Sequence, residues 1–535
     1  MIINWEKKMS KSNIVFNIVA DQGYIRSDGK RDFSAENDIL FSAISNTYVP
    51  LLNLFEVLRQ DRIDFKIGVV LSPIVCALLN DPQVQTEYVE WLDRRINLGN
   101  SEISKFKKDD PLYKNAADCL NAAQKAKTDF VEVYQQKLLK KFKEYQELGF
   151  IELISTSATS AFLPHLSGMQ EAINAQIEIG LMSQKQHFGS AGEGFYLPYN
   201  GYSEGLEYSL RPYGVNYTIL DANAILFSDK VPSTGIFAPV RTLNSLVVFG
   251  SDSDVPACII GDDGYAQHEV YKNVHRDIGF EYSIKELEPF AKNIERRVPT
   301  GYKYWNNSSD SQNFYDVEKA LQQAKIHAQN FVQKKTALLD KAKKYMEQDD
   351  PVLVCNIPAE LLGNKWAEGI NWFEEVLRLL NDNQTVQTNV CGNLIQNQFS
   401  LPKISPYPCA SNGTGYGEDF IDSKNDWMIR YIQKATARMI DLAERFPTDS
   451  GLKQRLLNLG AKEVLLCQSS AWPKMIKDGV YPQFAEEEFK KTVLAFSQVF
   501  DSLGCSTVST EWLTTIEKEH SIFQWLNYRV FSPKK

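Results

Sequence analysis

Four aspartates are the residues whose types and positions could support acid–base chemistry in this chain. Asp21, Asp221, Asp262 and Asp263 fall at or just after short apolar runs that we predict to be β-strands. Two neighbouring carboxyl groups with different pKa values can act as an acid and base pair. An aspartate in such a position is also a common cap for the following helix, so both interpretations stay open.

Metal and cofactor chemistry has little support in the residue spacing. The 535-residue chain has six histidines and eight cysteines, and it contains no HxH, HExxH or CxxC motif. Scattered cysteines in apolar runs are typical of reduced thiols inside a cell, not of a disulfide or zinc framework. We therefore expect no metal and no cofactor.

The composition excludes two classes of partner. Hydrophobic residues make up 43 % of the chain and charged residues 23 %, which is typical of a globular protein. A net charge of −9 and a pI near 5.5 argue against a broad surface for nucleic acid or anionic lipid. The longest apolar stretch, residues 67–79, is too short to cross a bilayer. We predict a cytoplasmic protein with neither a nucleic-acid nor a membrane partner.

Seven short apolar runs, each followed by a helix-length segment, are the elements that must position the four aspartates. The runs are continuous and not alternating, which is typical of parallel strands buried on both faces. This α/β pattern predicts a parallel barrel with its ligand site at the strand C-termini, although a doubly wound sheet would give the same pattern. The predicted strands are residues 13–20, 64–71, 150–156, 193–198, 216–220, 256–260 and 352–357.

Two helical regions accompany the predicted barrel, which we place over residues 10–400. Phe130, Tyr134, Leu138, Phe142 and Tyr145 form an apolar stripe at helical spacing. We therefore predict a helical insertion within the barrel at residues 85–149. The last part of the chain, residues 420–530, is predicted to be a C-terminal α-helical domain.

Nine sequence segments carry a family resemblance across almost the whole chain. They are NIVADQGYIR (17–26), TYVPLL (47–52), IELISTSAT (151–159), GFYLPYNGY (194–202), YTILDAN (217–223), VYKNVHRDIGFE (270–281), PAELLGNKWAEG (358–369), SSAWPKMIKDG (469–479) and NYRVF (527–531). In this order they resemble glycoside hydrolase family 57, in particular its α-1,4-glucan branching-enzyme-like branch. The resemblance implies an incomplete (β/α)7 TIM-like barrel, a helical insertion and a C-terminal helical domain.

The resemblance also implies where catalytic carboxylates should stand. A retaining glycosidase needs a nucleophile and an acid/base about 5–5.5 Å apart. The family nucleophile is a Glu after a Leu-Pro pair, and this chain has Tyr199 there. The family acid/base is the Asp that heads Asp-Ala-Glu-Leu, and this chain has Pro358. Neither position can supply a carboxylate, so we expect no catalytic residue at either.

Polar positions around this pair depart from the family pattern as well. The His-Ala-His motif is Val19-Ala20-Asp21 here, Ser160 replaces a histidine, and Ser-Asp-Trp-Pro has become 470–473, with Ala471 in place of Asp. Other family positions are kept, and they complete the set of candidate cleft or ligand-binding residues. The full set is Asp21, Tyr24, Arg26, Ser160, Tyr199, Asp221, Asp262, Trp366 and Trp472. For the two tryptophans, a sugar platform and core packing are both open interpretations.

Three functions follow from this resemblance. The leading hypothesis is a catalytically inactive homologue, acting in α-glucan metabolism, that binds α-glucan, an oligosaccharide or a protein partner. The first alternative is an active branching enzyme or hydrolase with relocated carboxylates. The second is a protein-interaction scaffold with a filled cleft. If the site has been vacated, the Tyr199 ring should lie over the barrel mouth, near Pro358 and Val19. The Asp21 carboxyl should then be satisfied by a local hydrogen bond or a basic side chain.

Overall fold

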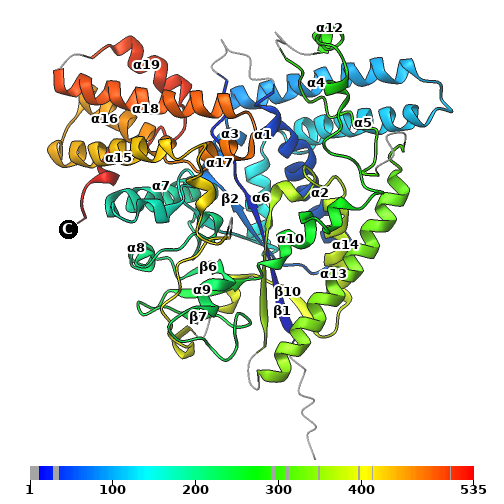
Figure 1. Cartoon of the computed structure of the whole chain (residues 1–535), viewed down its shortest axis with the longest axis horizontal. Helices are drawn as coiled ribbons and strands as arrows, with labels where there is room; N and C mark the ends of the chain where they lie inside the picture. Colours follow the sequence, from blue (N-terminus) through cyan, green and yellow to red (C-terminus); the bar gives the residue numbers. More distant parts are fainter. Residues whose placement is uncertain are drawn as a thin grey trace, which may run out of the picture.

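A nearly closed parallel β-barrel forms the centre of the molecule in a computed structural model (Figure 1). The sheet follows the order β3-β2-β1-β9-β8-β6-β5-β4. The described residues are 11–27, 35–290, 296–308, 313–346, 350–395, 398–411, 414–505 and 508–534. The barrel strands are β1 (Ser12–Ala20), β2 (Ile67–Leu71), β3 (Ile151–Leu153), β4 (Ser155–Thr156), β5 (Gly194–Tyr196), β6 (Tyr217–Asp221), β8 (Val247–Ser251) and β9 (Val352–Pro358).

The two ends of this sheet belong to one stretch of chain. Only Ile154 separates β3 from β4, and its backbone N–H donates to the Val69 carbonyl of β2 over 2.9 Å. If β3 and β4 are taken as one interrupted strand, the path has seven positions. The predicted (β/α)7 barrel is therefore confirmed, and the doubly wound sheet is excluded. Two short strands lie off this path: β7 (Val240–Arg241) pairs antiparallel with β8, and β10 (Val386–Asn389) pairs parallel with β1.

One predicted strand is wrong. Residues 256–260 belong to helix α10 (Asp254–Ile260), and the strand before it is β8. Within α10 the buried side chains are Val255 and Ile259, which are four residues apart and so share one helix face. A short apolar run does not by itself distinguish a buried strand from a buried helix turn. As a result, Asp262 and Asp263 follow a helix, not a strand.

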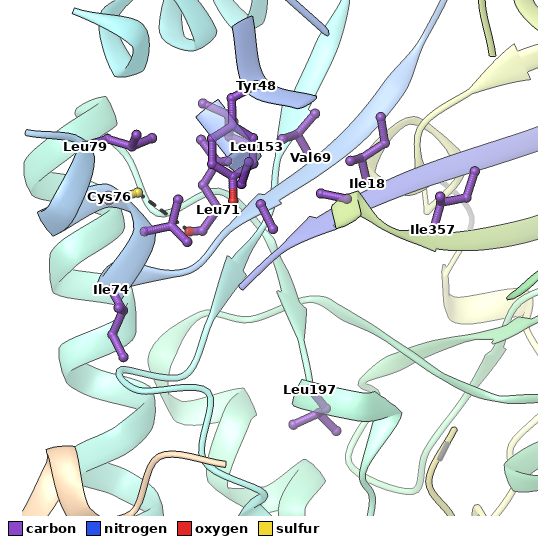
Figure 2. Packing of buried hydrophobic residues seen from close by; sticks show 14 of the residues in the cluster. Ile18, Tyr48, Val69, Leu71, Ile74, Cys76, Leu79, Leu153, Leu197 and Ile357 are labelled. Carbon is purple, nitrogen blue, oxygen red and sulfur yellow. Dashed lines mark hydrogen bonds between the residues drawn. The ribbon is translucent and has the colours of Figure 1, made fainter. Parts of the chain in front are cut away.

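Helices surround the barrel and share its hydrophobic core. Figure 2 shows Ile18, Val69, Leu71 and Leu153 from three adjacent strands, with Cys76 of α3 (Pro73–Leu79) donating to the Leu71 carbonyl over 3.7 Å. The other helices that flank the barrel are α1 (Asp38–Ala43), α2 (Val49–Gln60), α7 (Gln170–Phe188), α8 (Leu206–Leu210), α9 (Ala222–Leu226), α13 (Val317–Tyr345) and α14 (Gly369–Asp382). The short helices α11 (Ile278–Glu281) and α12 (Ile284–Leu287) lie beside the helices between β2 and β3.

Two groups of helices extend from the barrel, as Figure 1 shows. Between β2 and β3 lie α4 (Pro82–Lys105), α5 (Pro111–Thr128) and α6 (Leu138–Glu147). Four C-terminal helices share one apolar core with the barrel, so they pack on it as the fold prediction required. They are α15 (Trp427–Arg445), α16 (Gly451–Cys467), α17 (Ala471–Asp478) and α18 (Pro482–Cys505), and α19 (Thr510–Glu519) packs on α16 and α18 through Leu513. No helix in the described ranges is both long and apolar enough to cross a membrane.

Candidate functional site at the barrel mouth

Asp21 lies directly after β1, at the C-terminal end of the barrel. Its Oδ1 accepts a 2.6 Å hydrogen bond from the Ser160 hydroxyl, which comes from the loop after β4. Burial raises the pKa of Asp21 above its ordinary value, and hydrogen bonds from Ser160 and Ser72 partly oppose that rise. The expected local hydrogen bond to Asp21 is therefore present.

Tyr199 follows β5 and is half-buried at the same end of the barrel. Its backbone is left-handed, with φ at 56°, and its carbonyl accepts from the Ser411 N–H at 2.7 Å and hydroxyl at 2.8 Å. Its ring meets the Phe420 ring at an angle of 63°, with the centroids 4.7 Å apart. Burial and the nearby charges of Asp21 and Glu360 raise the pKa of Tyr199 well above 10. The phenol therefore stays neutral and packs as an aromatic side chain, and it does not point freely into solvent.

Pro358 is the last residue of β9, and its register partner on β1 is Val19. Two residues beyond this pair come Glu360 and Asp21, so the two carboxyl groups stand at equivalent places after adjacent strands. Glu360 is exposed and pairs with Lys365 at 2.8 Å. The sequence-based candidate set omitted Glu360. The signal that could have found it is its offset from Pro358, which equals the offset of Asp21 from Val19.

The other three candidate aspartates are placed differently from Asp21 and Glu360. Asp221 is buried and caps α9, because its Oδ1 accepts from the Asn223 N–H at 3.0 Å and its Oδ2 accepts from the Ser253 hydroxyl at 2.9 Å. Asp262 and Asp263 are exposed in the turn after α10. The helix-cap interpretation therefore applies to Asp221. Asp262 and Asp263 do not lie at a strand C-terminus, so the argument that placed them at the cleft fails.

Trp366 and Trp472 are core residues. Their exposed fractions are 1 % and 2 %. The Trp366 ring packs on Tyr271, with centroids 5.3 Å apart. The Trp472 ring lies against Gly23, where an added Cβ would be 3.3 Å from it, and its Nε1 donates to the Leu466 carbonyl at 3.1 Å. Neither ring has a face open to a sugar, so the core-packing interpretation applies to both.

Tyr24 and Arg26 connect the loop after β1 to other parts of the chain. The Tyr24 hydroxyl lies 3.4 Å from the Ser521 hydroxyl, and burial raises the pKa of Tyr24 to about 12. Arg26 forms a 2.7 Å ion pair with Asp81 at the start of α4 and donates to the Lys518 carbonyl of α19. The side-chain contacts of both residues are therefore with the helical regions, which they hold against the barrel.

Buried amides lie below the mouth, inside the barrel. Asn17 donates to Asn356 over 3.0 Å, Asn356 donates to Asn200 over 3.4 Å, and Asn200 donates to Ser251 over 3.1 Å. This series of hydrogen bonds connects β1, β9, the loop after β5, and β8. The barrel interior is therefore crossed by neutral polar groups. Among the described residues, no group of three His, Cys, Asp or Glu side chains is arranged to hold a metal ion.

Three exposed aromatic side chains gather beside the mouth, and we call them the aromatic trio: Phe227, Tyr407 and Tyr416. Their exposed fractions are 63 %, 39 % and 60 %. The Phe227 and Tyr407 centroids are 6.0 Å apart, and the hydroxyls of Tyr407 and Tyr416 are 3.5 Å apart. The Tyr407 N–H donates to the Ala224 carbonyl of α9 over 2.9 Å, which holds the trio at the C-terminal end of β6.

Sequence reasoning missed the aromatic trio. Its members are up to 189 residues apart in the chain, and none of them lies on a regular apolar pattern. An exposed aromatic ring offers a flat apolar face with a polar edge, which suits stacking on a sugar ring.

Comparison with family models gives two matches. The model "Glycosyl hydrolase family 57" matches residues 15–400, and the model "1,4-alpha-glucan branching enzyme, C-terminal" matches residues 431–531. The first match covers more than half of the chain, and the second covers most of the C-terminal helices.

Individual relatives agree with these matches. A 1,4-alpha-glucan branching enzyme of Thermococcus kodakarensis is 26 % identical over 528 residues, covering 92 % of this chain and 73 % of the relative. The crystal structure of the alpha-amylase AmyC of Thermotoga maritima superposes with a TM-score of 0.90 at 27 % identity, covering 98 % of this chain and 100 % of that one. A branching enzyme structure from Pyrococcus horikoshii has a TM-score of 0.87 at 21 % identity, over 98 % of both chains, and shares the fold.

Proposed function

Because the chain belongs to glycosyl hydrolase family 57 and its motif resemblance aligns Tyr199 and Pro358 with the family's catalytic positions, we propose that it binds α-glucan without cleaving or rejoining it. The observation that carries this proposal is the environment of Tyr199. A neutral phenol packed on Phe420 takes the place where a retaining enzyme needs an ionised carboxylate. A proline at the second position can neither donate nor accept a proton.

The α-glucan ligand is supported by the relatives and by the aromatic trio. The relatives named above are described as α-glucan branching enzymes and an α-amylase. In this chain Phe227, Tyr407 and Tyr416 expose aromatic faces at the end of the barrel where parallel barrels place their ligand sites. Exposed aromatic rings of this kind provide apolar contact area for a sugar chain at low cost in side-chain entropy.

Native affinity electrophoresis in gels containing glycogen tests this proposal, because retarded migration requires binding and no turnover. We expect the protein to be retarded and the double variant Phe227→Ala/Tyr416→Ala to migrate as it does without glycogen. The matched control is Tyr345→Ala. Tyr345 is 77 % exposed at the end of α13, before β9 begins, and so lies toward the opposite end of the barrel. Equal migration with and without glycogen would reject glucan binding and favour the protein-interaction scaffold.

A second candidate function is an active enzyme that uses Asp21 and Glu360 as a replacement pair. It is favoured by one observation: Asp21 and Glu360 each lie two residues beyond the register pair of Val19 and Pro358, and burial raises the pKa of Asp21. Two carboxyl groups in unlike environments are the arrangement that acid–base catalysis uses. Turnover of amylose that is lost in both Asp21→Asn and Glu360→Gln would establish this function and reject the first.

A further inference from the structure

A cavity of about 360 Å³ lies between the helical insertion and the barrel wall, away from the aromatic trio. Helices α4 and α5 form one side, and the segments 45–50, 272–274, 300–303 and 363–371 form the other. This volume lies within the range of about 300–1,000 Å³ that is usual for small-molecule sites. The cavity is therefore large enough for a metabolite.

The described lining of this cavity carries more positive than negative charge. Arg95, Lys272 and Lys303 line it, against the single carboxylate of Asp118. Lys272 lies over the Tyr315 ring, with Nζ 4.6 Å from its centroid. Neutral donors and acceptors, Asn46 and Asn371 among them, complete the polar part of the wall.

The carboxylates behind the wall are already engaged. Asp38 accepts from Arg95 at 2.6 Å and from the Ser42 hydroxyl at 2.8 Å. Asp277 accepts from the backbone N–H groups of residues 279, 300 and 301 and from the Thr300 hydroxyl, at 2.6–3.0 Å. These contacts hold the two carboxylates in place, so they attract Lys303 only from a distance.

Lys303 makes no side-chain hydrogen bond or ion pair with the described residues, although it is half-buried. Burial lowers the pKa of Lys303, and the charges of Arg95 and Lys272 lower it further, while Asp277 and Asp38 oppose this. A half-buried ammonium group without an ion pair is stabilised when an anion binds beside it.

The Arg95 side chain in the cavity wall is held between Trp91 and the loop at Gly301. Its guanidinium carbon lies 3.4 Å from the centroid of the Trp91 ring. On the loop that closes the cavity, Gly301 has φ at +80°, and a Cβ there would lie 2.3 Å from Arg95 Nη1. The positive φ favours glycine at this position, and the close contact brings the loop that carries Lys303 against Arg95.

We propose that this cavity binds a phosphate ester of a small metabolite of about hexose size, with its phosphate group at Lys303 and Lys272. Because Arg95 is paired with Asp38, Lys272 and Lys303 remain against Asp118 in the lining, and this positive excess suits an anion better than a neutral sugar. The asparagines on the wall can bind hydroxyl groups, and Ala122, Ala123 and Ile370 provide apolar contact. This site is separate from the glucan site proposed above and does not depend on it.

Alkylation of Cys119 tests the proposal directly, because Cys119 lines the cavity and Cys505 on α18 is an exposed thiol outside it. Iodoacetamide labelling of both residues is followed by peptide mass spectrometry at constant ionic strength. The ligands are inorganic phosphate, glucose 6-phosphate and glucose. At ten times Kd, the bound ligand should slow labelling of Cys119 about tenfold and leave Cys505 unchanged.

Protection by glucose 6-phosphate at lower concentration than by inorganic phosphate supports an ester as the ligand. Equal protection by the two contradicts the ester and assigns the site to the free anion. Equal protection by glucose, or no selective protection of Cys119 by any of the three, overturns the proposal.

A pair of lysine variants locates the bound anion. Lys303→Gln should raise the phosphate concentration needed for protection about 10- to 100-fold, the value of a charge-assisted hydrogen bond. Lys140→Gln, an exposed position on α6 outside the cavity, should leave it unchanged. If Lys303→Gln does not fold, Lys272→Gln serves in its place. Unchanged protection in a folded variant of either cavity lysine would falsify the assignment.

Discussion

The Ser160 hydroxyl donates a 2.6 Å hydrogen bond to Asp21, and this contact joins the loops that follow β4 and β1 at the barrel mouth. Ser160 holds a left-handed backbone conformation, with φ at 50°, and its carbonyl accepts from the Ser470 hydroxyl at the start of α17. The barrel and the C-terminal helices therefore meet at this pair. The carboxyl of Asp21 therefore accepts a hydrogen bond within the fold.

The free energy of unfolding should depend on pH through Asp21. Because its folded-state pKa is raised above 3.8, Asp21 favours the folded state at low pH, and this contribution is lost as pH rises through the folded pKa. In Asp21→Asn that loss should be absent. Thermal unfolding of both proteins from pH 4 to pH 8 should therefore show the variant gaining stability relative to the parent as pH rises.

Ser160→Ala is the companion variant. It removes a hydrogen bond that lowers the pKa of Asp21, so the loss of stability on raising pH should become larger. A constant difference in melting temperature between Asp21→Asn and the parent across this range would show that Asp21 titrates normally.

His165 should give a pH dependence of the opposite sign. Burial lowers the pKa of His165 to about 4 in the folded state, beside the rings of Phe162 and Phe420. Its stabilising contribution is therefore present above about 6.5 and is lost as pH falls toward 4, with an upper limit on the order of 3 kcal/mol. His165→Gln should lose less stability than the parent between pH 7 and pH 4. A chemical shift titration of the His165 ring with a midpoint near 6.5 would contradict this.

The purified protein should neither branch nor hydrolyse amylose. The iodine-complex absorbance of amylose should stay at the level of a protein-free control, since residues 199 and 358 supply no carboxylate. The double variant Tyr199→Glu/Pro358→Asp should also stay inactive. Removing the Tyr199 ring leaves a gap beside Phe420, and a reacting group displaced by 1 Å can lose about a hundredfold in rate. Strong activity of the double variant would show that the rest of the site is still intact.

Trp472→Ala should destabilise the protein without a direct effect on glucan binding. The ring is 2 % exposed between Gly23 and the C-terminal helices, and losing a buried tryptophan costs about 3–5 kcal/mol. Denaturant unfolding should show this loss, whereas Tyr345→Ala should change the unfolding free energy by less than about 0.5 kcal/mol. In glycogen gels at low temperature the folded Trp472→Ala variant should still be retarded. Loss of retardation with unchanged stability would restore the sugar-platform interpretation.

The sequence by itself determined the barrel and the residue types at positions 199 and 358. Six of the seven predicted strands coincide with observed ones, because continuous apolar runs are what parallel strands with two buried faces require. The alignment of Tyr199 and Pro358 with the family's catalytic positions uses only the order of the motifs along the chain. The seventh predicted strand is wrong because helix α10 buries Val255 and Ile259 within an equally apolar run.

Only the tertiary structure decided what surrounds these positions. The pairing of Asp21 with Ser160, the burial of Trp366 and Trp472, and the exposure of the aromatic trio all join segments far apart in the sequence. The cavity at Lys303 likewise needs helices α4 and α5 on one side and residues 363–371 on the other. The burial and the pKa of a side chain depend on how distant segments pack in space. The spacing of residues along the chain predicts only the packing within one helix or strand.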